Sequence, residues 1–105
     1  MSNASVFGSR LRAARVRSGL TQMQLGVMAK IDEYSASARV NQYERGKHHP
    51  DFATAERLAE VLGVPVGYLY TSDETLAELI LVIGRLDSGQ RQDLLRTARI
   101  LLETP

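Results

Sequence analysis

The fold is decided by the stretch from Thr21 to Gly46, which reads TQMQLGVMAKIDEYSASARVNQYERG. It predicts two short helices, over residues 21–30 and 36–45, joined by the linker 31–35. Thr21 can cap the first helix, because its hydroxyl can accept a hydrogen bond from a backbone N–H that lacks a partner at a helix start. Gly46 follows the second helix, and glycine readily takes the left-handed conformation that ends a helix. Two helices in this order are commonly used to read DNA.

The second helix of this pair has an apolar side and a polar side. Val40 and Tyr43 form the apolar side, which we expect to be buried. The polar side carries donors and acceptors of the kind that contact base edges and phosphates. These side chains are Ser37, Arg39, Asn41, Gln42 and Arg45. A polar face that is simply solvated is the alternative interpretation.

Apolar spacing and turn residues predict further helices on both sides of this pair. They cover residues 5–18, 51–62 and 65–70, followed by two helices with apolar faces over residues 76–86 and 94–102. The pattern contains no convincing strand, so we expect an all-α fold.

The composition is that of an ordinary globular protein. A chain of 105 residues with 44% hydrophobic residues suits a single domain with a modest core. No apolar run approaches the ~20 residues that a membrane helix needs, and residues 1–12 lack the apolar stretch of a signal peptide. The absence of cysteine excludes disulfides and cysteine-ligated zinc. We therefore expect a cytoplasmic protein that does not bind membranes.

The charges are distributed unevenly along the chain. Residues 1–50 carry eight basic and three acidic side chains, a net of +5, whereas residues 51–105 carry five basic and nine acidic ones, a net of −4. Such asymmetry suggests that the N-terminal half faces a polyanion and that the C-terminal half has another task.

The two C-terminal helices are unusually apolar. Leu79-Ile80-Leu81-Val82-Ile83 is an unbroken apolar run, which is wider than the single stripe of a surface helix. Either the protein's own core or a second copy of the chain must cover this surface. We favour the second copy.

Several short motifs occur in one order along the chain. They are Leu11-Arg12-Ala13-Ala14-Arg15, Ser18-Gly19-Leu20-Thr21-Gln22, Leu25, Ala29, Val40, Tyr43-Glu44-Arg45-Gly46, Pro50 and Leu58-Ala59-Glu60-Val61-Leu62-Gly63-Val64. Together they resemble the Cro/repressor-type, or XRE-like, helix-turn-helix transcriptional regulators. The resemblance implies a five-helix λ-repressor-like DNA-binding domain over residues 7–70, after a flexible tail at 1–6 and before a helical extension at 71–105. The linker 31–35 is longer than the usual turn of the family.

The resemblance also implies roles for individual residues. Ser37, Ala38 and Gln42 match the positions that face base edges, and Arg39 and Asn41 are expected to add contacts. Glutamine suits adenine and arginine suits guanine in the major groove.

Other matched positions imply contacts to the DNA backbone and a structural ion pair. Gln22 matches a glutamine that contacts phosphate in the family. Arg15 and Glu44 match a buried ion pair that fixes the reading helix. Further phosphate contacts are expected from Arg45, Lys47 and His48.

These features predict a sequence-specific regulator, a repressor, that binds double-stranded DNA at a palindromic operator as a homodimer. The alternative is an antitoxin-like module whose C-terminal helices bind a partner protein. We expect no cofactor and no enzymatic activity, because the sequence shows no recognisable catalytic arrangement. We also expect no metal site, since His48-His49 has no third ligand pattern nearby.

Overall fold

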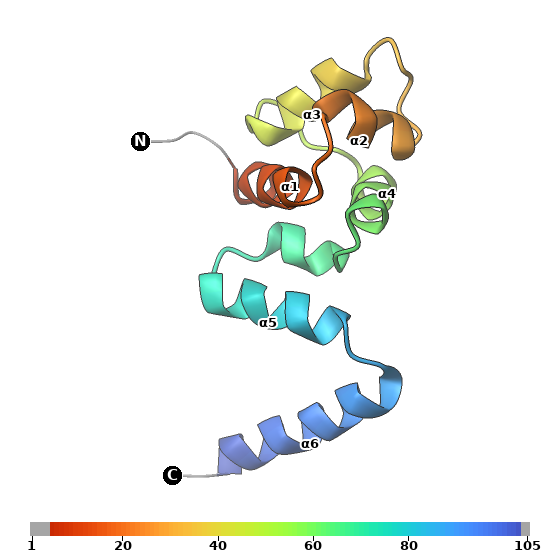
Figure 1. The fold of residues 1–105 in the computed structure, drawn as a ribbon. Helices are drawn as coiled ribbons and strands as arrows, with labels where there is room; N and C mark the ends of the chain where they lie inside the picture. The colour runs from red at the N-terminus through yellow and green to blue at the C-terminus, as the bar shows by residue number, and fades with distance from the viewer. Residues whose placement is uncertain (1–4, 104–105) are drawn as a thin grey trace.

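The computed structural model describes residues 5–103 and is helical throughout this part of the chain, so the all-α fold class is confirmed (Figure 1). The elements are α1 (Val6–Arg17), α2 (Gln22–Met28), α3 (Ala36–Glu44), α4 (Phe52–Leu62), the 3₁₀ helix η1 (Val66–Tyr70), α5 (Glu74–Gly84) and α6 (Ser88–Glu103). Most of the predicted N-terminal tail, residues 1–4, lies outside the described residues.

Five helices begin at a side chain that accepts a hydrogen bond from the backbone N–H three residues further on. The capping pairs are Ser5 and Gly8, Thr21 and Gln24, Asp51 and Thr54, Asp73 and Leu76, and Asp87 and Gln90. The predicted cap at Thr21 is therefore confirmed, and the side chain of Gln24 in turn accepts from the Thr21 N–H. The pKa of Asp51 is lowered from its usual value by the hydrogen bonds that Thr54 donates through its side chain and its backbone.

Helix α2 ends two residues before the boundary predicted from the sequence. Ala29 is its C-terminal cap and Lys30 takes a left-handed conformation with a φ of 67°. The N–H of Ile31 then donates to the carbonyl of Gly26 at 2.9 Å, which closes a Schellman turn. The side chain of Ile31 packs against the core, so tertiary contact turns the chain where helix propensity alone would extend the helix.

The core joins the first five elements. The five largest fully buried side chains come one from each of them: Leu11 from α1, Leu25 from α2, Val40 from α3, Leu58 from α4 and Leu69 from η1. Each of these elements therefore contributes to one continuous core, which holds α2 and α3 in place.

The predicted fifth helix over residues 65–70 is a short 3₁₀ helix. Pro65 precedes it in an extended conformation, and only five residues follow before the chain turns at Thr71. Tyr68 and Leu69 point inward and are buried. This segment is a short plug that closes the core beside α1 and α4.

The two C-terminal helices differ in how they contact the body. In α5, Ala77 is buried in the core cluster, and Ile80 and Leu81 pack against that cluster. In α6 no residue is buried, and Figure 1 shows this helix extending away from the rest of the molecule. The body thus continues past residue 70, and the division into units 7–70 and 71–105 stays a prediction.

Candidate nucleic-acid interface

Helices α2 and α3 cross at a very short distance. A Cβ atom placed on Gly26 would lie 2.7 Å from the Cβ of Ala36, so the contact depends on two small residues. The chain between them makes a turn in which the Ser35 N–H donates to the carbonyl of Asp32 at 3.0 Å. The longer linker therefore forms an extra turn outside the crossing, where Tyr34 is 92% exposed.

An ion pair joins α1 to the last turn of α3. Arg15 donates from Nε to Oε2 of Glu44 at 2.5 Å and from Nη2 to Oε1 at 3.1 Å. The Nη1 group of the same guanidinium donates to the carbonyl of Leu20 at 2.9 Å. The Glu44 side chain is 3% exposed and that of Arg15 is 12% exposed, so this two-bond ion pair is largely screened from water. Two parallel bonds of this kind fix orientation as well as distance.

Gln22 extends this network from the start of α2. Its Nε2 donates to Oε1 of Glu44 at 3.1 Å and to Oδ1 of Asn41 at 3.2 Å. Both amide hydrogens are therefore used within the protein. No sequence pattern predicts this link, because the partners are 19 and 22 positions apart.

The polar side of α3 is open where Ser37, Ala38 and Arg39 lie, and these three residues are exposed. Gln42 is half-buried. On the opposite side of the helix Val40 and Tyr43 are buried, as the periodicity predicts.

Arg39 and Gln42 are not engaged by the rest of the protein. Within residues 5–103, neither side chain takes part in a hydrogen bond or an ion pair. Their polar groups are consequently available to an external partner.

A shallow hollow of about 370 Å³ continues this face toward the loop after α3. It is lined by Arg39, Gln42, Tyr43, His48 and His49. The loop is held to the helix because the N–H groups of Lys47 and His48 donate to the carbonyl of Gln42 at 3.0 and 3.4 Å.

The surroundings of the hollow are basic. Arg45 and Lys47 are exposed on the same helix end and loop, and His48, which lines the hollow, is also exposed. Glu44, the acidic residue of this helix, is buried and bonded to Arg15. The open surface of α3 and its loop therefore carries positive charge that its own carboxylate does not neutralise, which suits an anionic partner.

Among residues 5–103 no group of three or more histidine, cysteine, aspartate or glutamate side chains is placed to hold a metal ion. Within the same range no helix is both long enough and apolar enough to cross a bilayer.

With this geometry established, comparison with known proteins decides the family. A sequence model described as a helix-turn-helix domain matches residues 6–67, which is more than half of the chain. The chain belongs to this helix-turn-helix family. The expected XRE-like character is supported by two relatives, and the resemblance stated from the sequence is confirmed.

The first relative of this helix-turn-helix protein is the cryptic phage CTXphi transcriptional repressor RstR of Vibrio cholerae. It is 31% identical over 104 residues, which cover 92% of this chain and 88% of the relative. The second is the transcriptional regulator BswR, known from a crystal structure. It superposes with a TM-score of 0.83 at 50% identity and covers 91% of this chain and 95% of its own. The likeness to both extends beyond the domain match into the C-terminal helices, and the protein is a helix-turn-helix transcriptional regulator.

Proposed function

We propose that this protein is a repressor that binds a palindromic operator as a homodimer and reads its sequence with α3. One observation carries the proposal: Arg39 and Gln42 stand on an open helix face without partners in the protein, while the ion pair behind them fixes the helix. The relative from Vibrio cholerae bears the name of a repressor, which supports repression rather than activation.

The base-reading contacts come from residues that reach the open side of α3. Gln42 pairs with adenine and Arg39 with guanine, each through two hydrogen bonds in the major groove. Ser37 and Ala38 have short side chains, so they allow the helix to approach the bases closely. They contact small polar groups or methyl groups on the base edges. The side-chain oxygen of Asn41 accepts a bond from Gln22, so a contact with adenine through both its oxygen and its nitrogen requires that bond to open.

The phosphate contacts flank the reading helix. Arg45, Lys47 and His48 lie in or beside the loop after α3, where they meet the DNA backbone on one side. Gln22 lies at the start of α2 on the other side. Since both of its amide hydrogens are already donated, it contacts a phosphate by exchanging the longer bond, to Asn41, for one to a phosphate oxygen. That exchange also frees Asn41 to turn toward the bases.

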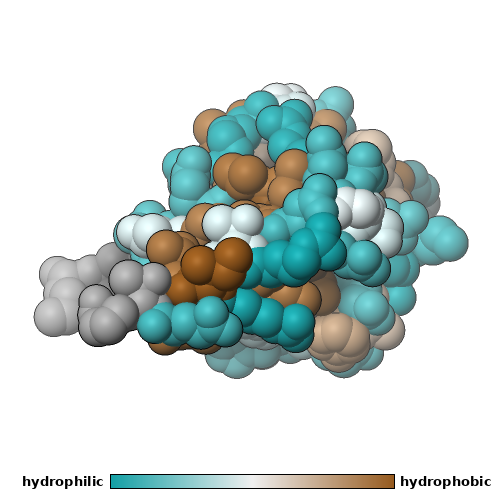
Figure 2. Space-filling view, turned by 90° about the horizontal axis from the view of Figure 1, so that it is seen from below, coloured by the Kyte–Doolittle hydropathy of each residue, from teal (hydrophilic) through white to brown (hydrophobic). Residues whose placement is uncertain are grey.

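Dimerisation uses the apolar surface of α5 and α6. Leucines on both helices and Val82 on α5 are exposed, and Figure 2, which looks at the molecule from the α6 side, displays hydrophobic surface among the polar residues. The exposed residues are Leu76, Leu79 and Val82 on α5 and Leu94, Leu95, Leu101 and Leu102 on α6. Because a free apolar surface of this kind is costly in water, a second copy of the chain covers it.

The proposed dimer binds DNA by non-covalent contacts, without a cofactor. Two copies place their α3 helices in successive major grooves ~34 Å apart, which is one turn of the duplex. Occupation of such a site blocks access of the transcription machinery to the promoter.

The test is a selection of bound sequences from random duplex DNA, followed by binding measurements over a series of salt concentrations. We expect an inverted repeat to be selected and its affinity to fall by about 10³-fold or more between 50 and 200 mM salt, because counterions are released from the DNA. A duplex of the same composition in shuffled order is the control. Selection of no motif, or affinity that is independent of salt, contradicts the proposal. Co-purification of a different protein on α5 and α6 would instead support the antitoxin-like alternative.

A further inference from the structure

Helix α5 is attached to the body at both of its ends by unlike contacts. At its start, Arg10 of α1 donates from Nε to the carbonyl of Thr71 at 3.0 Å and from Nη2 to the carbonyl of Ser72 at 3.1 Å. The same guanidinium lies 3.2 Å from the carboxylate of Glu74. At its end, Gly84 is packed so closely on Pro65 that an added Cβ would lie 2.6 Å from Cγ of the proline. The first attachment is polar and depends on one side chain, whereas the second depends on shape.

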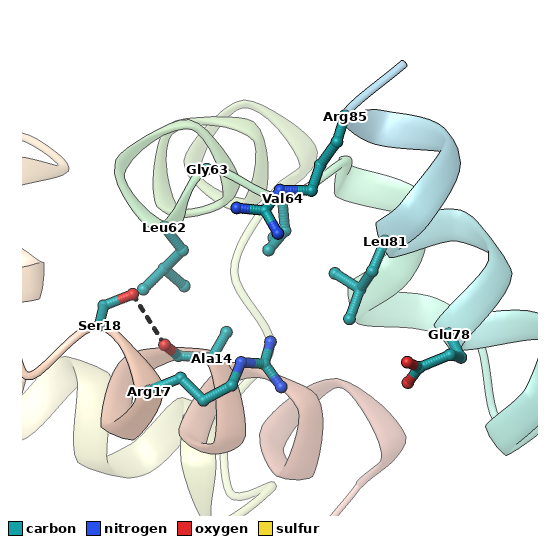
Figure 3. Close-up of a pocket in the computed structure, with 9 residues that line it drawn as sticks. All are labelled: Ala14, Arg17, Ser18, Leu62, Gly63, Val64, Glu78, Leu81 and Arg85. Carbon is teal, nitrogen blue, oxygen red and sulfur yellow. Dashed lines mark hydrogen bonds between the residues drawn. The ribbon is translucent and has the colours of Figure 1, made fainter. Parts of the chain in front are cut away.

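Between these ends the seam beside α5 is only partly filled. A hollow of about 450 Å³ lies between α1, the turn after α4 and α5, and Figure 3 shows Leu62 and Leu81 on opposite sides of it. The guanidinium groups of Arg17 and Arg85 also point into this space in Figure 3. Glu78 of α5 also lines the hollow, but no ion pair is formed across it among Arg17, Glu78 and Arg85, all of which lie within the described residues.

Ala77 is buried, and Ile80 and Leu81 pack against the core, so these contacts keep α5 docked. The hollow beside them leaves α5 room to pivot about these contacts and Pro65 once its start is released.

Arg10 is suited to prevent that pivot. Its side chain is 14% exposed, and its guanidinium carbon lies 5.6 Å from the ring centroid of Tyr68, a buried residue of η1. A planar guanidinium held against a ring can bond two successive carbonyls at once, which a flexible ammonium group does less well. The start of α5 is consequently held in one orientation relative to α1.

The connection between α5 and α6 is also held by an arginine side chain. Arg91 donates to the carbonyls of Ile83 and Gly84, the last residues of α5, at 3.0 and 3.2 Å. The orientation that Arg10 imposes on α5 is thus passed on to α6. Any surface formed by these two helices is positioned relative to α3 through the contact at Arg10.

We propose that Arg10 is a positioning residue that sets the spacing of the two half-sites the protein accepts. This inference rests on the proposed dimerisation through α5 and α6. Each base pair inserted between half-sites moves them apart by ~3.4 Å and turns one against the other by ~35°. A dimer in which α5 is fixed on the body of each copy can bind both half-sites at one spacing. A dimer in which α5 pivots on the body can bind them at several spacings.

The experiment compares the wild type with Arg10→Met, which keeps the aliphatic stem against Tyr68 and removes the donors. Arg10→Lys serves as a second variant with the charge retained, and Arg12→Met, an exposed position on the same helix, is the control for lost charge. Each is given duplexes in which two copies of the selected half-site are separated by every spacing from zero to ten base pairs. Circular dichroism and sedimentation report the fold and the mass of each variant.

For the wild type and Arg12→Met we expect the best spacing to bind about tenfold or more tightly than its neighbours that differ by one base pair. For Arg10→Met we expect that preference to shrink to about threefold or less, with the half-site sequence and the dimer mass unchanged. Arg10→Lys should lie between them. An equally sharp preference in folded Arg10→Met, or in Arg10→Lys if the former does not fold, overturns the inference. A wild type that is monomeric or binds single half-sites only would overturn the proposed dimer instead, so the two failures are distinct.

Discussion

Nε of Arg15 lies 2.5 Å from Oε2 of Glu44, and this contact joins α1 to the end of the helix that carries Arg39 and Gln42. The carboxylate also accepts a bond from Gln22 at the start of α2. One buried side chain thus ties three helices together. The polar face of α3 is presented at a fixed angle because the charge that holds it is turned inward.

We expect Glu44→Ala to destabilise the fold by about 3–5 kcal/mol, because it leaves the Arg15 guanidinium in a screened position without its partner. Replacement of both members by methionine should recover most of this loss, since an apolar pair of similar volume carries no unpaired charge. Urea unfolding monitored by circular dichroism measures both effects. Glu56→Ala, at an exposed position of α4, is the control and should change stability by less than about 0.5 kcal/mol. A decrease of less than about 1 kcal/mol in the free energy of unfolding of Glu44→Ala would show that the ion pair contributes little to stability.

Substitutions on and beside α3 should separate base reading from backbone contact. We expect Gln42→Ala and Arg39→Ala each to lose about 1–3 kcal/mol of discrimination at one base position of the half-site. Lys47→Ala should instead weaken binding to all sequences alike and reduce the slope of affinity against salt by about one. Sequence selection and salt titration of the three variants provide the measurements. If both α3 variants select the same motif as the wild type, these two residues do not read bases.

Local chemistry in the sequence was enough to predict the parts of the fold that depend on neighbours along the chain. Thr21 caps α2 because its hydroxyl is three residues from a free N–H, and Gly46 adopts a φ of 72° after α3 as expected of its residue type. The alternation of Val40 and Tyr43 with polar residues likewise predicted which side of α3 is buried.

Contacts between distant residues could not be predicted in the same way. The bond from Gln22 to Asn41 exists because α2 and α3 cross at Gly26 and Ala36, and polar side chains give no periodic signal of such a meeting. Arg10 on α1 gave no sign of its bonds to Thr71 and Ser72 for the same reason. The assignment of Ser37, Ala38 and Gln42 to base reading rests on the family resemblance, and that of Arg39 and Asn41 rests on the polar face of the helix. All five assignments stay predictions.

Charged substitutions on α6 should separate the two copies of the proposed dimer. We expect Leu95→Glu and Leu101→Glu to give monomers that remain folded, because both side chains are exposed and contribute nothing to the core of one chain. Their affinity for the inverted repeat should fall by about 10²-fold, since the second half-site no longer benefits from a tethered copy. Sedimentation equilibrium and anisotropy provide the two readouts. Gln92→Glu adds the same charge at another exposed position of α6 and should leave the dimer intact. Dimers that persist in both leucine variants would place the interface elsewhere.

Gly8 controls how closely α1 approaches the end of α3. An added Cβ would lie 2.4 Å from the carbonyl oxygen of Glu44 and 2.6 Å from that of Tyr43, and neither backbone atom can turn aside. Alanine is the better helix former, so a purely local argument predicts that Gly8→Ala stabilises α1. We expect the opposite, a loss of about 1–3 kcal/mol from overpacking, together with weaker DNA binding because the ion pair to Glu44 is displaced. Gly67→Ala is the matched control, since a Cβ there meets nothing within 4 Å. Thermal unfolding of the two variants decides the question: equal melting temperatures would mean that α1 can shift away from α3 without cost.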